Sequence, residues 1–401
     1  MAGRIAAIAG ISAALDSGGS PDTTIAAVAD DGTALDLLVG GGEAKGKSVA
    51  AAAKKLGPWN ALMLRPIRSV NAADGETAGA ETRGAETRGA PLVQPGDSVA
   101  EAARRILQRH LEQFMARTYG LACREDVEYV HEMRVALRRF RAAMRVFGAA
   151  VEGLPPELKG EVRFFAQELG GVRDLDVFMD FLDGYAGRAP RAHKPFLRGL
   201  VQSVRRRRSG RYRALVATFG SGRYEEFKDR YHALLKASVE SGDGLRPRGK
   251  KGQRGMRAAA PRMLRRRLRK VLKYDRRPDR YPPQKLHALR IECKKLRYTA
   301  EFLADIYPGG LHEIIGPMTQ MQDALGEVHD ADLYAERVGR YLKRSRRGRE
   351  AGAQRAERAL LGHLQEVRGQ SLARAAGVLQ GFRRRKALTG LEKLMRTPRQ
   401  K

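Results

Sequence analysis

The sequence predicts an all-α fold, a duplicated helical bundle whose two pseudo-symmetric halves each hold about four to six helices. Beyond residue 96 the apolar residues recur at helical spacing, and we find no alternating strand pattern. Two separate motifs recur at one offset of 156 residues. The chain's positive charge lies almost entirely in this helical part.

The charge is strongly basic and unevenly distributed. The 401-residue chain carries a net charge of +31. Residues 1–95 hold nine Lys or Arg against ten Asp or Glu, so residues 96–401 carry +32. Such a charge implies a polyanionic partner, which could be nucleic acid, an anionic membrane surface or a phosphate polymer.

The cysteine spacing and the hydropathy of the sequence indicate in which cellular compartment the protein is expected. Cys123 and Cys293 form neither a metal-ligand spacing nor a disulfide framework, which favours a reducing environment. No apolar run approaches the ~18 residues that a membrane helix needs. The start, Met1–Leu15, faintly resembles an export signal, but it has only one Arg and its apolar stretch is mostly Ala and Gly, so export is the less favoured alternative. We expect a cytoplasmic protein without membrane segments.

Residues 1–95 are predicted to be a low-complexity or degenerate segment, partly disordered or a small α/β remnant. Residues 24–29 and 34–39 flank Asp30-Asp31-Gly32 and could form a hairpin, and residues 50–64 could form a short helix. The tandem repeat at 79–90 is typical of a flexible linker.

The first half, 96–245, begins with a capping box formed by Ser98 and Glu101, which predicts a helix to about Arg117. A second helix is expected at 130–147, ended by Gly148, and Pro155-Pro156 start a third that reaches Leu169.

We expect Gly170-Gly171 to break that third helix and a new one to run from Arg173 to Leu182. A long basic helical region follows Pro195 and ends before a basic, Gly-rich connector at 241–255.

The helix at 130–147 has two distinct faces. Its buried face is predicted to hold Met133, Leu137, Phe140, Met144 and Phe147. An adjacent arc of roughly 80° holds cations only. We call these residues the first basic face: His131, Arg134, Arg138, Arg141 and Arg145. A solvated helix surface usually mixes both signs of charge, so a single-sign face calls for an explanation, although an ordinary solvated face remains an alternative.

The same pattern returns 156 residues later. A second basic face is formed by His287, Arg290, Lys294 and Arg297, beside a core face of Leu289, Cys293, Leu296, Ala300 and Leu303. Leu169–Asp176 also recurs, as Leu325–Asp332. The second half therefore spans about 254–400. Duplication favours a pseudo-twofold arrangement, and we hypothesise that the two basic faces meet in one cleft.

These motifs resemble the CHAD domain family. The resemblance rests on His-x-x-Arg-x-x-x-Arg-Arg-x-Arg at 131–141, its counterpart at 287–297, and the two Leu-Gly-x-x-x-Asp-x-Asp segments. It covers residues 96–400. It implies two helical bundles around a basic central surface, binding of inorganic polyphosphate and association with polyphosphate granules, with neither catalysis nor a cofactor.

The resemblance and the charge pattern give the candidate residues. Polyphosphate contacts are expected from His131, Arg134, Arg138, Arg139, Arg141, Arg145, His287, Arg290, Lys294, Lys295 and Arg297. For the two histidines, a structural hydrogen bond is an equal alternative. A supporting basic surface is expected from Arg104, Arg105, Arg109, Arg265, Arg266 and Arg269. The runs at 205–208, 265–267 and 383–385 are interpreted as general electrostatic surface.

Four acidic residues are interpreted as structural: Asp174, Asp176, Asp330 and Asp332. We expect them to cap the helix after the glycine break and to pair with arginines. Their Asp-x-Asp spacing also suits metal-bound carboxylates. His329-Asp330 is matched by Arg173-Asp174 in the first half, and arginine is not a usual metal ligand. We therefore expect no metal site.

Two departures weaken the match. Arg145 corresponds to Glu301 and Arg173 to His329, so the second half should bind phosphate more weakly. Many relatives carry a CYTH-type domain upstream, but its Glu-x-Glu-x-Lys start is absent here. We interpret residues 1–95 as a reduced or unrelated remnant.

Two alternatives remain open. A nonspecific RNA- or DNA-binding protein would use the same charge, though the sequence has no RNP motif or zinc finger and only 6% aromatic residues. A metal-dependent polyphosphate- or triphosphate-processing enzyme would need a metal cluster or an activated nucleophile, and we find neither. Oligomeric state does not follow from the sequence.

Overall fold

A computed structural model describes residues 23–28, 34–39, 91–118, 121, 127–240, 244–275, 277–307, 310–344 and 350–396. The chain forms two compact units, Met1–Glu86 and Thr87–Lys401. In the first unit, β1 (Thr23–Val28) pairs antiparallel with β2 (Ala34–Val39), which confirms the strands of the predicted hairpin. The helix expected at 50–64 and the linker at 79–90 lie outside the described residues.

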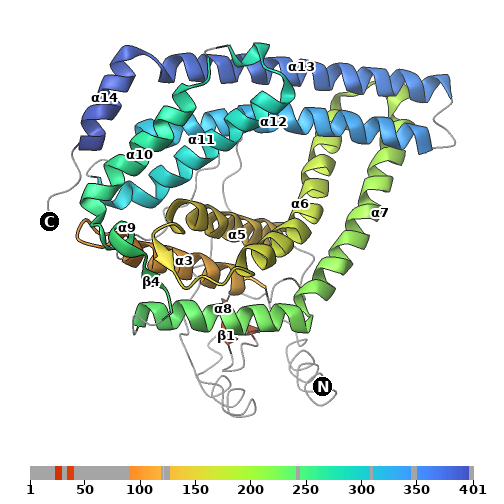
Figure 1. The fold of residues 1–401 in the computed structure, drawn as a ribbon. Helices are drawn as coiled ribbons and strands as arrows, with labels where there is room; N and C mark the ends of the chain where they lie inside the picture. Colours follow the sequence, from red (N-terminus) through yellow and green to blue (C-terminus); the bar gives the residue numbers. More distant parts are fainter. Residues whose placement is uncertain are drawn as a thin grey trace, which may run out of the picture. The chain divides into compact units, whose positions relative to one another are not determined.

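The second unit is helical, as predicted (Figure 1). Its first half contains α3 (Val99–Met115), α5 (Val127–Phe147), α6 (Leu158–Arg188), α7 (Lys194–Phe219) and α8 (Gly222–Glu240). Its second half contains α10 (Met256–Leu272), α11 (Pro283–Leu303), α12 (His312–Arg344), α13 (Ala351–Phe382) and α14 (Arg385–Arg396). Between them lie β4 (Arg246–Pro247), which pairs with β3 (Val151–Glu152), and α9 (Gly249–Gln253).

The helices repeat at nearly the offset that the motifs gave. Adding 156 to the bounds of α5 gives the bounds of α11, and α6 and α12 end at equivalent residues, Arg188 and Arg344. Adding 157 to the bounds of α3 gives those of α10, and every buried residue of α10 has a buried equivalent on α3 at that shift. The connection between α10 and α11 is therefore one residue shorter than the connection between α3 and α5.

Local signals at the helix ends are largely confirmed. Ser98 Oγ accepts a hydrogen bond from the Glu101 amide at 3.2 Å, and the Glu101 carboxylate accepts one from the Ser98 amide at 2.6 Å. Helix α5 ends before Gly148, as expected.

The break predicted at Gly170-Gly171 is wrong. Helix α6 runs unbroken from Leu158 to Arg188, because the neighbouring Leu169 and Val172 are both buried in the core. A glycine in a helix costs about 1 kcal/mol relative to alanine, which such burial exceeds. The four aspartates therefore lie inside helices, and the capping role assigned to them is also wrong.

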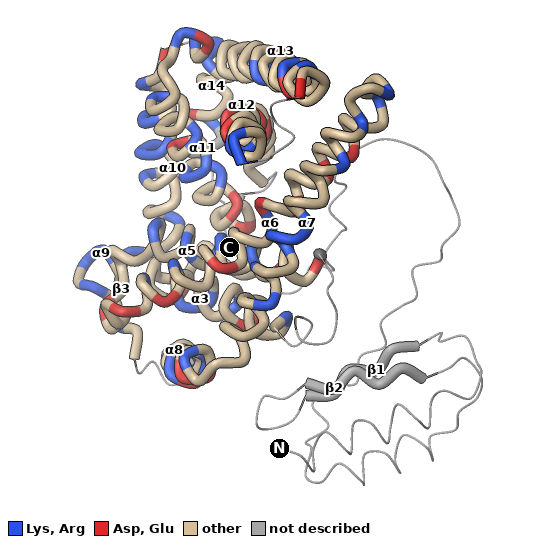
Figure 2. The backbone as a smooth tube through the Cα atoms, turned by 90° about the vertical axis from the view of Figure 1, so that its right-hand side faces the viewer, with Lys and Arg blue, Asp and Glu red and all other residues tan. Residues whose placement is uncertain are grey.

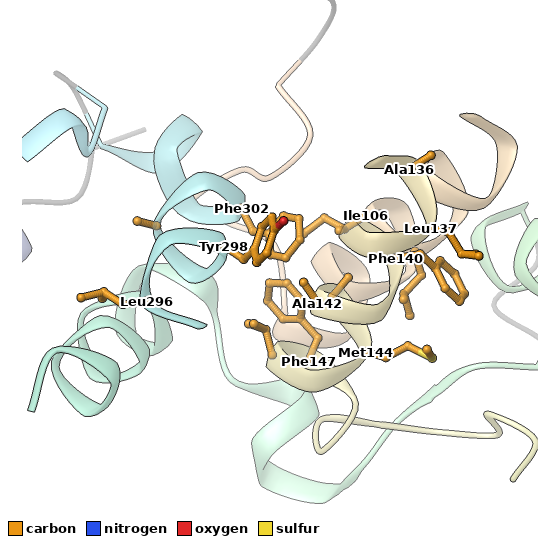
Figure 3. Packing of buried hydrophobic residues seen from close by; sticks show 14 of the residues in the cluster. Ile106, Ala136, Leu137, Phe140, Ala142, Met144, Phe147, Leu296, Tyr298 and Phe302 are labelled. Carbon is orange, nitrogen blue, oxygen red and sulfur yellow. The ribbon is translucent and has the colours of Figure 1, made fainter. Parts of the chain in front are cut away.

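The core contains every residue predicted for the buried faces of α5 and α11. It is wider than predicted, because Ala142 and Val146 on α5 and their equivalents Tyr298 and Phe302 on α11 are buried as well. Phe147 and Phe302 lie with ring centroids 5.9 Å apart where α5 meets α11 (Figure 3). Equivalent apolar surfaces thus join the two halves.

A second, smaller core holds the ends of the long helices together. It contains Phe178 of α6 and the equivalent Tyr334 of α12, whose ring centroids are 4.5 Å apart. Helices α7 and α13 contribute Leu200 and Leu360. This second core fixes α6 relative to α12, and both helices carry acidic residues that face the site described next.

Candidate polyanion-binding site

The two basic faces converge. Helix α5 contacts α11, and Arg134 and Arg138 from the first face lie close enough to Lys294 of the second to lower its pKa. Arg138 also lies close enough to Arg290 to lower its pKa. We call Arg134, Arg138, Arg290 and Lys294 the central cation cluster. Its members come in equivalent pairs, because adding 156 to 134 and 138 gives 290 and 294.

Two equivalent carboxylates lie beside this cluster. Asp174 on α6 accepts a hydrogen bond from Arg134 Nη2 at 3.3 Å. Asp330 on α12 lies within the electrostatic reach of Arg290, Arg134 and Asp174. Burial raises the pKa of Asp330, although His329 and Arg290 act in the opposite direction. Four cations thus face two carboxylates, and the cluster keeps a net positive charge.

Lys294 has the most perturbed charge of the cluster. Burial, together with the neighbouring Arg290, Arg138, Arg134 and Arg297, lowers its pKa to about 7. Arginine stays protonated at neutral pH, so Lys294 alone among the four changes charge there. A bound anion would favour the charged amine, so binding should raise this pKa and take up a proton.

Part of the cluster's hydrogen-bonding capacity is unused. The Nε atoms of Arg138 and Arg290 are buried and have no hydrogen-bond partner among the described residues. A buried donor without a partner costs about 1–3 kcal/mol. Phosphate oxygens placed between α5 and α11 would satisfy such donors.

Beyond the cluster the two halves differ. In the first half, Arg145 on α5 and Arg163 on α6 both lie close enough to Arg141 to lower its pKa, although burial is the larger cause. In the second half, Arg297 Nε lies 3.2 Å from the Glu301 carboxylate, and its Nη1 donates to Thr319 at 3.3 Å.

The positions are equivalent, because 141, 145 and 163 shifted by 156 are 297, 301 and 319. The first half therefore presents three cations where the second presents one cation held by one carboxylate. This is the asymmetry expected from Arg145 and Glu301.

Several predicted residues lie elsewhere. Arg139 and Arg109 lie close enough to His110 of α3 to lower its pKa. Lys295 Nζ forms an ion pair with Glu292, 2.6 Å away on its own helix. Both Arg139 and Lys295 follow a cluster residue directly in sequence, so a turn of about 100° carries them away from it.

The two histidines flank the cluster. His131 is partly buried, whereas His287 is exposed with its ring 6.3 Å from that of His329.

The supporting surface is divided. Arg104 donates to the Leu245 carbonyl at 3.2 Å, Arg105 pairs with Asp97, and Arg265 lies near Tyr307. Arg266 and Arg269 are exposed.

The arginine runs have mixed roles. Arg208 is buried and its Nε donates to Asp176 at 2.9 Å, and Arg267 is also buried. Arg383 donates to the Tyr274 carbonyl at 2.8 Å. For these three residues, interpretation as general electrostatic surface is wrong. The predicted pairing of aspartates with arginines is confirmed for Asp174, Asp176 and Asp332, which accepts from Arg368 at 2.8 Å.

Two site residues, Arg163 and Arg337, were missed from the sequence, and a third, Arg173, was named there only as a difference between the halves. Arg173 lies near Arg134, and Arg163 lies near Arg141. Arg337 of α12 donates from Nη1 to the Asp174 carbonyl at 2.6 Å. The helical register of α6 could have indicated Arg163 and Arg173. Arg337 corresponds to Phe181 in the first half, so the repeat gave no signal for it.

Within the described ranges, no three His, Cys, Asp or Glu side chains gather as a metal site would require. Over the same residues, each helix is too short or too polar to cross a membrane.

Comparison with known proteins agrees with this geometry. The sequence model of the CHAD domain matches residues 105–339, which is more than half of the chain. The chain belongs to the CHAD domain family. The match contains α5, α11 and both carboxylates. CHAD domains are a polyphosphate-binding family.

Solved structures show the same fold. The CHAD domain from the plant Ricinus communis is 23% identical to this CHAD protein, with a TM-score of 0.58, and the alignment covers 73% of this chain and 96% of that one. PptA from Streptomyces chartreusis is 14% identical with a TM-score of 0.56, covering 71% of this chain and 100% of that one. No curated protein matches significantly.

Proposed function

We propose that this protein binds inorganic polyphosphate through the central cation cluster and does not cleave it. The supporting observation is the convergence of Arg134, Arg138, Arg290 and Lys294 from two equivalent helices. Polyphosphate carries roughly one negative charge per phosphate along a flexible chain. A chain lying between α5 and α11 would meet cations from both sides.

The chemistry of the cluster suits phosphate oxygens. Guanidinium groups bind such oxygens in bidentate fashion, and charge-assisted hydrogen bonds are the stronger kind. From the cluster the chain would continue toward Arg141, Arg145 and Arg163, where the first half is more basic. We propose that binding serves to place the protein on polyphosphate granules or to organise them.

A titration with polyphosphates of defined length and with RNA, at several salt concentrations, tests this function. We expect the affinity for polyphosphate to fall steeply with salt, because each neutralised phosphate releases counterions. RNA at equal phosphate concentration should not displace the polymer. If RNA displaces it, the protein is a general nucleic-acid binder. Phosphate release with Mg²⁺ or Mn²⁺, lost in Asp174→Ala or Asp330→Ala, would instead establish an enzyme.

A further inference from the structure

A second concentration of charge lies outside the central cation cluster. Between residues 244 and 274 the chain has 13 Lys or Arg and no Asp or Glu. Eleven of these cations are exposed. We call them the outer basic strip: Arg246, Arg248, Lys250, Lys251, Arg254, Arg257, Arg262, Arg266, Arg269, Lys270 and Lys273.

From Arg262 onward, the α10 part of the strip occupies one helix face, whereas Arg257 at the start of the helix lies on another side. At about 100° per residue, its five positions from Arg262 to Lys273 fall within an arc of roughly 100°. The opposite side of α10, with Leu264, Leu268 and Val271, is buried. At ~1.5 Å per residue the five cations span about 16 Å along the helix. Figure 2 shows Lys and Arg along α9 and α10.

The connector part of the strip is held in place by the backbone. Strand β4 pairs with β3, and the Arg248 amide donates to the Ala150 carbonyl at 2.8 Å. Gly252 packs so closely that an added Cβ would lie 2.3 Å from the Ala150 oxygen. The charges at 246–257 are therefore carried by a fixed backbone, and this segment leads directly into the N-terminus of α10.

Few acidic groups compensate the strip. Glu152 lies opposite Arg246 in the β3–β4 pair. Within the described residues, none of the eleven side chains makes an ion pair. Helix α7 also lacks acidic residues, but it places Arg208 in the Asp176 ion pair and Arg207 near Arg337. The charge of α7 therefore belongs partly to the fold and to the first site.

The α10 part of the strip has no equivalent of the same charge in the first half. At the shift of 157, the five α10 cations correspond on α3 to Arg105, Arg109, Glu112, Gln113 and Ala116. Arg105 is paired with Asp97 there. The second half is thus less basic than the first at the central site and more basic on its outer helix. Because α3 adopts the same fold without most of these cations, the fold itself does not require the positive charge on α10.

The strip is also separate from the central cation cluster. Helix α10 packs on α11 and α3 through its buried side, so its cations point away from both helices. The cluster lies on α5 and on the other side of α11. At least the thickness of one helix, about 10 Å, separates the two surfaces.

We propose that the outer basic strip is a second polyphosphate-binding surface, which lets one molecule bridge two polyphosphate chains or two segments of a long one. This inference rests on the function proposed above. Polyphosphate fits better than single-stranded nucleic acid, because residues 246–273 contain no Phe, Tyr or Trp on which bases could stack. Two separate surfaces on one protein make binding multivalent and join polymers into a network.

The test compares two variants that each lose four exposed cations. The strip variant is Arg262→Gln, Arg266→Gln, Arg269→Gln and Lys273→Gln. The matched control is Lys159→Gln, Arg188→Gln, Lys236→Gln and Arg355→Gln, whose sites are exposed and scattered over α6, α8 and α13. Far-UV circular dichroism checks that both fold. Each is titrated with tripolyphosphate and with long-chain polyphosphate, and light scattering follows condensation with the long polymer.

We expect the strip variant to bind tripolyphosphate within about twofold of wild type, because the central cluster is intact. Its affinity for the long polymer should fall roughly tenfold, and condensation should be lost. The control should behave as wild type. Condensation by the strip variant at the wild-type level, or equal loss in the control, overturns the proposal. Loss of RNA binding alone would assign the strip to nucleic acid. Failure of wild type to bind either polyphosphate would refute the proposed function instead.

Discussion

Reversing both equivalent arginines of the central cluster, Arg134→Glu with Arg290→Glu, is expected to weaken polyphosphate binding by roughly 100-fold or more. A hydrogen bond to a charged group contributes about 1.5–3 kcal/mol, and two are lost here. The new carboxylates would also lie beside Asp174 and Asp330, adding repulsion at the point where α5 and α11 meet. Isothermal titration calorimetry with tripolyphosphate measures the effect.

The control must carry the same change of charge. The arginine run at 383–385 as a whole is unsuitable as a control, because Arg383 donates a hydrogen bond to the Tyr274 carbonyl and its loss would disturb the fold. Arg355→Glu with Arg384→Glu alters two exposed residues and should cost less than about threefold. Arg138→Gln with Lys294→Gln tests the same cluster without new negative charge. Equal losses in the cluster variants and the control would mean that only bulk charge matters.

Removing the buried carboxylate of Asp176 is expected to destabilise the fold by about 3–5 kcal/mol. Asp176 of α6 and Arg208 of α7 are both buried and joined by a 2.9 Å hydrogen bond. In Asp176→Ala the guanidinium would stay buried over the Tyr212 ring without its carboxylate. Urea unfolding followed by circular dichroism measures the loss.

A double variant separates the ion pair from packing. Asp176→Leu with Arg208→Met removes both charges, and apolar replacement of a buried pair is often neutral. We expect it to recover most of the stability lost in Asp176→Ala. If the double variant is as unstable as the single one, side-chain shape rather than the broken Asp176–Arg208 ion pair explains the loss.

The sequence predicted the parts of the fold that depend on local pattern. The capping box at Ser98, the end of α5 before Gly148 and the buried faces of α5 and α11 follow from spacing and residue type. The 156-residue offset placed Arg134 and Arg290 at equivalent positions, and these positions come together at the join of the two halves.

What the sequence did not reveal depends on tertiary packing. The core overrides Gly170-Gly171, so α6 continues and brings Asp174 beside Arg134. Ala142 and Val146 form a second apolar side of α5, which is buried because α11 packs against it, and this packing could not be predicted from the α5 sequence alone. Arg337 reaches the site from a position whose equivalent is a phenylalanine, so no repeat pattern could indicate it.

Because the two halves differ in charge, we expect the first half to bind phosphate more tightly at the central site. Arg141, Arg145 and Arg163 stand where the second half has Arg297, Glu301 and Thr319. Because Arg297 is already paired with Glu301, a phosphate must compete with that carboxylate. Under the proposed function, the two halves therefore offer phosphate different surfaces rather than two copies of one.

Chemical labelling of Lys294 tests the central claim most directly. Amine-reactive reagents modify the neutral amine, and with a pKa of about 7 Lys294 should react faster at neutral pH than the exposed Lys236 of α8. Mass spectrometry after brief acetylation reads both sites. We predict that tripolyphosphate suppresses modification of Lys294 and leaves Lys236 unchanged, because the bound anion covers the cluster amine and favours its protonated form. Unchanged labelling of Lys294 at saturating polyphosphate would contradict the account.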